Sequence, residues 1–129
     1  MIMEELLHAL SYLFYAVAHA DRHVDDVERE RIHQVVNENW QLLAAKGDPF
    51  GIKAMELIDR MVKELDEDQY ETEVALERFK RAFELHPEFF TAEMKEFILE
   101  VCIRTANSFN RMNKAELVIL SRIEKIIHG

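Results

Sequence analysis

The stretch VAHADRHVDDVE, residues 17–28, joins two predicted helices through a turn rich in acids. Within it, Asp25 is a good helix N-cap and Glu28 follows three positions later, which is the spacing of a capping box. The stretch TANSFNRMNKAE, residues 105–116, aligns with it without gaps and places Glu116 at the position of Glu28. The sequence therefore predicts a weak internal repeat of helix-turn-helix type, in which each copy ends one helix and starts the next.

Apolar residues at helical spacing extend outward from the first turn. The preceding helix, predicted over about residues 3–20, carries one apolar stripe at spacings of three and four: Leu6, Leu10, Leu13, Phe14 and Val17. Further helices are predicted over about 26–45, 50–65, 66–85, 91–108 and 114–127, with the acids 66–68 starting the fourth and Thr91 capping the fifth. The chain has only 3 glycines and 2 prolines, too few for many strands and tight turns. We therefore expect an all-α, single-domain bundle of about six to seven helices over residues 1–129.

Composition limits the kinds of partner that the chain can have. The formal net charge is −9, and no run of Lys and Arg with interleaved aromatics is present, so nucleic acid is an unsuitable partner. No stretch approaches the roughly 18 uncharged apolar residues of a membrane-spanning helix, and the N-terminus lacks the features of a signal peptide. We therefore expect a cytoplasmic protein that binds another protein and contacts a membrane only through it. The single cysteine, Cys102, lies in an apolar helical run and is expected to be an inert core thiol.

Acidic side chains in the two turns are candidate ligands for a divalent cation. Glu28 and Glu116 fall on the apolar sides of their helices, where a carboxylate is costly unless a cap N–H or a cation satisfies it. Asp21 and Asp25 would join Glu28, and such a set of carboxylates favours Ca²⁺ or Mg²⁺. The alternative is that Glu28 and Glu116 only cap their helices.

Two histidines flank Asp21 and could join the same site. If His19 or His23 became a ligand, the preferred ion would shift toward Zn²⁺. The spacing is neither a recognised zinc signature nor an EF-hand loop, which needs a central glycine and a bidentate glutamate at its twelfth position. The alternative interpretation is an ordinary polar turn.

The longer stretch YAVAHADRHVDDVERERI, residues 15–32, resembles the helix-turn-helix signature of the TerB-like superfamily. The positions that match the signature are Ala20, Asp21, Val24 and Glu28. Arg22 replaces its usual glycine, and in the second copy Phe109 replaces its aspartate, which argues against two equivalent metal centres. The resemblance implies an all-helical bundle with a pseudo-repeat. It also implies a non-enzymatic binding or adaptor module linked to tellurite or metal stress, with an acidic patch for divalent cations.

Two Glu-x-x-His pairs suggest a different function, that of a small helical metalloenzyme. Pairs of this kind hold di-iron centres when their side chains project into a helical bundle. The first pair is Glu5 and His8, and both point away from the apolar stripe of their helix. The second pair is Glu30 and His33, of which Glu30 points away from the apolar side. The helical wheel thus argues against a buried iron pair, and inward-pointing side chains would support it.

Tyr12 and Tyr15 lie opposite the apolar stripe of the first helix. Aromatic side chains that stay exposed are enriched at protein interfaces, so these tyrosines are candidates for a partner surface. The alternative is that another helix covers them, which a central first helix would require.

Overall fold

The computed structural model describes residues 2–19, 52–107 and 114–128, together with the single positions 27, 30 and 34. The helices of these ranges are α1 (Ile2–His19), α3 (Ile52–Glu67), α4 (Thr72–Leu85), the 3-10 helix η1 (Pro87–Phe89), α5 (Ala92–Asn107) and α6 (Lys114–His128). These ranges contain no strand, so the prediction of an all-α fold is confirmed. The predicted second helix falls outside the described residues, apart from the three single positions, which are helical.

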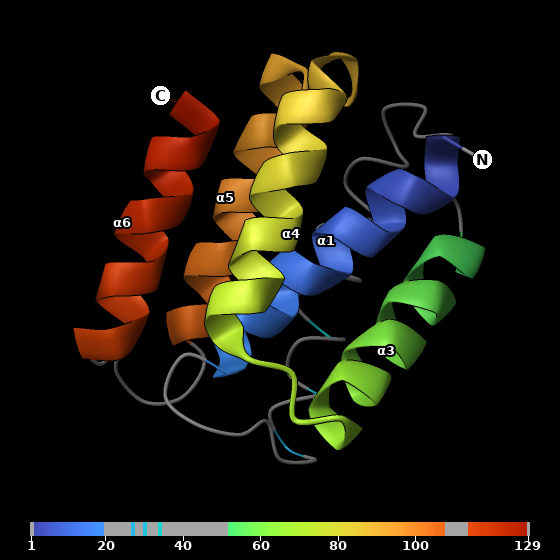
Figure 1. The fold of residues 1–129 in the computed structure, drawn as a ribbon, viewed down its shortest axis with the longest axis vertical. Helices are drawn as coiled ribbons and strands as arrows, with labels where there is room; N and C mark the ends of the chain where they lie inside the picture. The colour runs from blue at the N-terminus through green and yellow to red at the C-terminus, as the bar shows by residue number, and fades with distance from the viewer. Residues whose placement is uncertain are drawn as a thin grey trace.

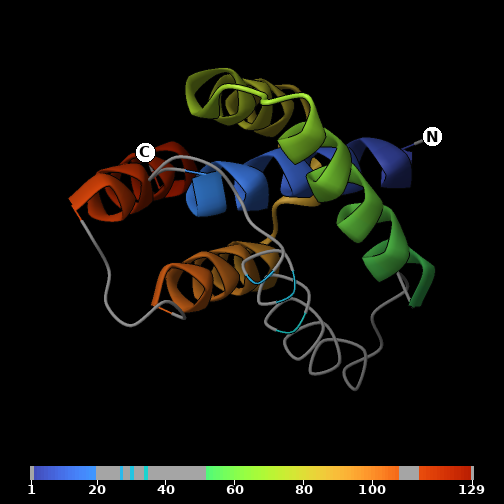
Figure 2. The ribbon, with the colours of Figure 1, turned by 90° about the horizontal axis from the view of Figure 1, so that it is seen from below.

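Helix α1 runs through the middle of the bundle and contacts α3, α4, α5 and α6. Figure 1 shows α4 in front of α1, with α3 and α6 on opposite sides, and Figure 2 shows α1 between α4 and α5. All five residues of the predicted stripe are buried: Leu6, Leu10, Leu13, Phe14 and Val17. Because burying one large apolar side chain contributes about 1.5–3 kcal/mol, α1 supplies a large share of the stability of the core.

The helices around α1 contribute the other side of the same core. Their buried side chains include Ile58 and Val62 of α3, Leu76 and Phe79 of α4, Ile98 and Val101 of α5, and Ile119 and Ile123 of α6. Cys102 is buried among them, and burial raises the pKa of its thiol far above its ordinary value. The prediction of a core thiol is therefore confirmed, and the thiol stays protonated.

The connection between α3 and α4 differs from the prediction. We expected the acids 66–68 to start a helix, but α3 continues to Glu67 and α4 begins at Thr72. Gln69 adopts a left-handed conformation with φ of 52°. Its N–H donates to the Asp66 carbonyl at 3.0 Å, and the Tyr70 N–H donates to the Leu65 carbonyl at 3.0 Å. This pair of bonds is a Schellman motif, which ends a helix and outweighs the preference of acids for an N-terminus.

The start of α5 follows the local sequence signals. The backbone N–H of Met94 donates to the side-chain oxygen of Thr91 at 3.2 Å, so Thr91 is the N-cap of α5 as predicted. The preceding helix, α4, ends at Leu85, before His86 and Pro87, because a residue that precedes proline avoids helical geometry.

Candidate functional site

The C-terminal end of α1, which leads into the acidic turn, is fixed to the connection between α3 and α4. The Tyr15 hydroxyl donates to the Tyr70 carbonyl at 2.8 Å. The ring of His19 stacks on Tyr15 at 4.8 Å between centroids, and its Nδ1 lies 2.8 Å from the Thr72 hydroxyl. These contacts join residues that are far apart in the sequence. They hold the last turn of α1, and hence the point where the acidic turn starts, in a defined position.

Thr72 makes two contacts with His19. Its hydroxyl lies 3.3 Å from the His19 carbonyl and 2.8 Å from Nδ1 of the ring. The tautomer of the ring decides whether Nδ1 donates to the hydroxyl or accepts from it. Both contacts fix the orientation of the His19 side chain at the end of α1.

Tyr15 is completely buried, so the prediction that it belongs to an exposed partner surface is wrong. Burial raises the pKa of Tyr15 to about 12, and the nearby charge of Asp66 adds to the shift. Tyr12 is half-buried, and its ring packs against that of Tyr70 at 5.6 Å between centroids. The helical wheel failed here because α1 is surrounded by other helices, which was the alternative interpretation.

Most of the predicted cation ligands lie outside the described residues: Asp21, His23, Asp25 and Glu28. Glu116 lies in the first turn of α6, and its side chain is outside the described set. Within the described part, no group of three or more His, Cys, Asp or Glu side chains could hold a metal ion. The acidic cation site therefore stays a prediction.

The helix ends that border the predicted site lie at the same end of the bundle. In Figure 1, α1 ends and α6 begins at the lower end of the molecule, and Figure 2 is seen from that end. The two helices are in contact. The connection between α3 and α4 is also at this end, and it carries the exposed acids Glu67, Asp68 and Glu71.

The side chains of the Glu-x-x-His alternative do not project into the bundle. Glu5, His8 and Glu30 are all exposed, and His33 lies outside the described residues. Glu5 instead pairs with His86, with 2.9 Å between Oε2 and Nε2. Although α1 is central and Leu6 and Leu7 are buried, Glu5 and His8 lie on the side of the helix that faces solvent. The exposure of Glu5, His8 and Glu30 argues against a buried di-iron centre built on these pairs.

Sequence reasoning missed a pocket of about 330 Å³ between α1 and α4. Its lining residues are Glu5, His8, Ala9, Tyr12, Arg78, Arg81, Ala82, Leu85 and His86. The one sequence signal was the spacing of Arg78 and Arg81, which places both on the same side of a helix. Their partners on α1 are far away in the sequence, so only the packing of α1 against α4 brings the set together.

The arrangement is that of a helical module with a central first helix and an acidic end. The family comparison agrees with this class: the model described as tellurite resistance protein TerB matches residues 7–128, and the chain belongs to this family. It is thus a helical module of the tellurite-resistance type. Neither a curated protein nor a solved structure matched the chain in the other two comparisons. Among the described helices, none is long and apolar enough to cross a membrane.

Proposed function

We propose that this chain is a non-enzymatic binding module that holds one divalent cation at its acidic end. Asp21, Asp25 and Glu28 of the first turn and Glu116 of α6 would supply the oxygen ligands. The observation that carries the proposal is that α1 ends and α6 begins at the same end of the bundle. The acidic turn follows α1 directly in the sequence, and Glu116 lies in the first turn of α6.

The charge at this end of the molecule also supports the proposal. The exposed acids Glu67, Asp68 and Glu71 lie at the same end, on the connection between α3 and α4. Their field adds to that of the proposed ligands, because charges near a protein surface interact over several ångströms before salt screens them. A cation would be concentrated at this end, and it would offset the mutual repulsion of the carboxylates.

The ligand chemistry decides which ion is expected. Carboxylate oxygens alone select Ca²⁺ or Mg²⁺. His19 is the last residue of α1, so as an additional ligand it would shift the preference toward Zn²⁺. His23, as a ligand, would also shift the preference toward Zn²⁺.

A cation at this position would couple three helices. It would link the end of α1 and the start of the predicted second helix to the start of α6. It would thereby order the surface that a protein partner meets. In this proposal the single domain of residues 1–129 is an adaptor in a cytoplasmic assembly, and ion binding controls the shape of one end of it.

Thermal unfolding of the metal-stripped protein tests the cation site. The protein is unfolded without ions and with Ca²⁺, Mg²⁺, Zn²⁺ or Fe²⁺, beside the double variant Asp21→Asn/Glu28→Gln. An ion present at 100 times its dissociation constant stabilises the folded state by about 2.7 kcal/mol. We expect this gain in the parent protein and its loss in the variant.

A matched control removes two acids elsewhere. The variant Glu96→Gln/Glu100→Gln changes two exposed carboxylates of α5 and lowers the negative charge by the same amount. It should keep the full stabilisation by the ion. If no ion stabilises the parent, or if the control loses the effect equally, the cation site is wrong. The acids would then be helix caps of a purely structural interaction domain.

A further inference from the structure

The pocket between α1 and α4 lies away from the acidic end. Glu5, His8 and Tyr12 come from the first two-thirds of α1, Arg78 comes from the middle of α4, and Arg81 comes from its last two turns. His86, the residue after α4, completes the set. In Figure 1 the N-terminal part of α1 and the end of α4 lie in the upper part of the molecule. A ligand here would therefore be separate from a cation at the other end.

Positive charge dominates the lining of this pocket. It contains two guanidinium groups, Arg78 and Arg81, and a single carboxylate, Glu5. That carboxylate is paired with His86 at 2.9 Å. Neither arginine forms an ion pair with another described residue. This is unusual for a chain with a net charge of −9, in which carboxylates are plentiful, and it leaves both guanidinium forks available to an anion.

Further hydrogen-bonding side chains complete the polar side of the pocket. The Tyr12 hydroxyl lies in the field of Arg78, which opposes the rise in the pKa of Tyr12 caused by burial and by Tyr70. Tyr12 therefore keeps its proton at neutral pH, and its hydroxyl interacts with the Tyr70 side chain beside the pocket. His8 is exposed at the edge of the pocket and adds a ring N–H. His86 is held in place by Glu5, by Glu88 at 3.5 Å, and by stacking on Phe89 at 5.0 Å between centroids.

The remaining lining is apolar and partly uncovered. Ala9 of α1 and Ala82 and Leu85 of α4 are the apolar residues of the lining. Leu85 is 66% exposed, the largest value among the large apolar side chains of the described residues. A ligand with both an anionic and an apolar part would fit this arrangement. Its anionic part would bind the unpaired arginines, and its apolar part would cover Leu85.

We propose that this pocket binds a small organic oxyanion, of the phosphate monoester or carboxylate class, with an apolar body. The anionic group lies on Arg78 and Arg81, because a guanidinium fork matches the geometry of phosphate and carboxylate oxygens. His8 donates a further bond, and the apolar body covers Leu85 and Ala82. A volume of about 330 Å³ has room for a ligand of this size but not for a folded partner.

Phenyl phosphate is the probe that tests this inference, because it combines a phosphate group with one apolar ring. Binding is measured by titration calorimetry and by amide shifts in NMR spectra, at constant ionic strength, against inorganic phosphate and phenol. We expect saturable binding of phenyl phosphate that is tighter than that of either fragment. The shifts should map to residues of α1 and α4.

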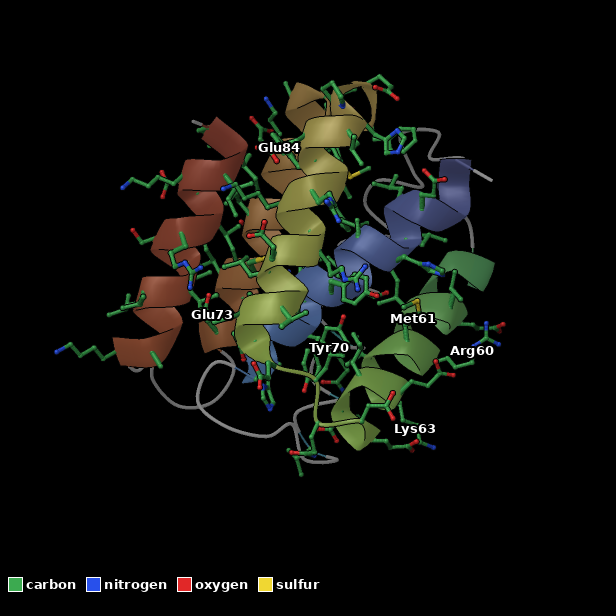
Figure 3. The ribbon with its side chains drawn as sticks, viewed as in Figure 1. Arg60, Met61, Lys63, Tyr70, Glu73 and Glu84 are labelled. Carbon is green, nitrogen blue, oxygen red and sulfur yellow. The ribbon has the colours of Figure 1, made fainter. Side chains whose placement is uncertain are left out.

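The double variant Arg78→Gln/Arg81→Gln should weaken phenyl phosphate binding by about tenfold or more, because it removes both guanidinium groups that bind the anion. The matched control is Arg60→Gln/Lys63→Gln. These two residues have the same spacing on α3, are exposed, and point away from the bundle in Figure 3. The control changes the net charge equally and should leave the affinity within about twofold, because distant surface charges are screened.

A third variant, Leu85→Ser, separates the apolar contact from the charge. It should weaken phenyl phosphate binding but leave the affinity for inorganic phosphate unchanged. The inference is overturned if phenyl phosphate does not saturate the protein, if the arginine variant binds as well as the parent, or if the α3 control loses the same affinity. Equal binding of phenol would overturn it too, because the pocket would then recognise only the ring.

Discussion

Helices α1 and α6 are both rich in apolar residues, but they occupy different places in the bundle. From Leu6 to Ala18, all residues of α1 are buried except His8 and Tyr12. Among the described side chains of α6, only Ile119, Ile123 and Ile127 are buried. The other apolar residues of α6 include Leu117 and Val118, which are 55% and 52% exposed. An apolar stripe therefore shows which face of a helix meets the core, but it does not show how many other helices surround that helix.

The difference follows from the number of helices that each one contacts. Helix α1 has α3, α4, α5 and α6 around it, so even its second face is covered. Helix α6 lies at the edge, where an ion pair between Arg122 and Glu73 of α4 reinforces its contacts (Figure 3). We therefore expect substitutions in α1 to cost much more stability than substitutions on the outer face of α6.

The largest effect is expected for Phe14→Ala in α1. Phe14 is completely buried, so the substitution removes a large apolar surface and leaves a cavity. We expect the free energy of unfolding to fall by about 3–5 kcal/mol, measured by urea denaturation. Leu117→Ala in α6 is the matched comparison, and it should change stability by less than about 0.5 kcal/mol. Similar losses for both variants would show that α1 is not the central helix.

An intermediate effect is expected for Tyr15→Phe. The variant removes the hydroxyl that donates to the Tyr70 carbonyl at 2.8 Å, which should cost roughly 1 kcal/mol at neutral pH. The ordinary pKa of 10.0 applies to the unfolded chain, and the folded value is raised to about 12. Between these two pKa values, Tyr15 loses its proton in the unfolded chain before it does so in the folded protein. The free energy of unfolding of the parent therefore falls as pH rises, by roughly 1–3 kcal/mol.

The measurement compares denaturation of the parent and of Tyr15→Phe at neutral pH and at several values above pH 9. The advantage of the parent should shrink steadily through the alkaline range. Tyr15→Phe has no hydroxyl that titrates at this position, so its own loss of stability at high pH should be smaller. A constant difference at every pH would contradict the burial of the Tyr15 hydroxyl.

The smallest effect is expected for Glu73→Gln. The carboxylate of Glu73 accepts two bonds from Arg122, at 2.5 and 2.8 Å, but the two side chains are 69% and 43% exposed. An exposed pair of this kind is worth about 0.2–1 kcal/mol. The bond from Arg122 lowers the pKa of Glu73, so its contribution is present at neutral pH and is lost as the pH falls below the ordinary value of 4.5.

Denaturation at neutral pH and at about pH 3 tests this prediction. The difference between the parent and Glu73→Gln should disappear in acid, and it should also fall at high salt. The control Glu84→Gln removes an exposed carboxylate of the same helix for which no ion pair with a described residue is seen (Figure 3). It should show no such pH-dependent difference.

Sequence patterns predicted the features that depend on a few neighbouring residues. The stripe of α1, the N-cap at Thr91 and the end of α4 before Pro87 all follow from interactions within about one helical turn. The all-α class and the family also follow from such patterns, because helical spacing and the first turn are local features.

Features that depend on packing could not be predicted in the same way. The burial of Tyr15 requires the other helices to cover the second face of α1. The end of α3 depends on the left-handed conformation of Gln69, a residue type without a strong preference for it. The pocket requires His8 and Arg78 to meet across two helices. No local signal carries this information, because the contacts join distant parts of the chain.

The proposed cation site is tested most directly by amide NMR of the metal-stripped protein during a titration with Ca²⁺. The prediction is one saturable set of shifts that includes residues 21–28 and the first turn of α6, with the same dissociation constant for both. The Asp21→Asn/Glu28→Gln variant should lose both sets together. Shifts that increase without saturation, or that are confined to Glu67, Asp68 and Glu71, would show general attraction to acids and would contradict a site shared by the turn and α6.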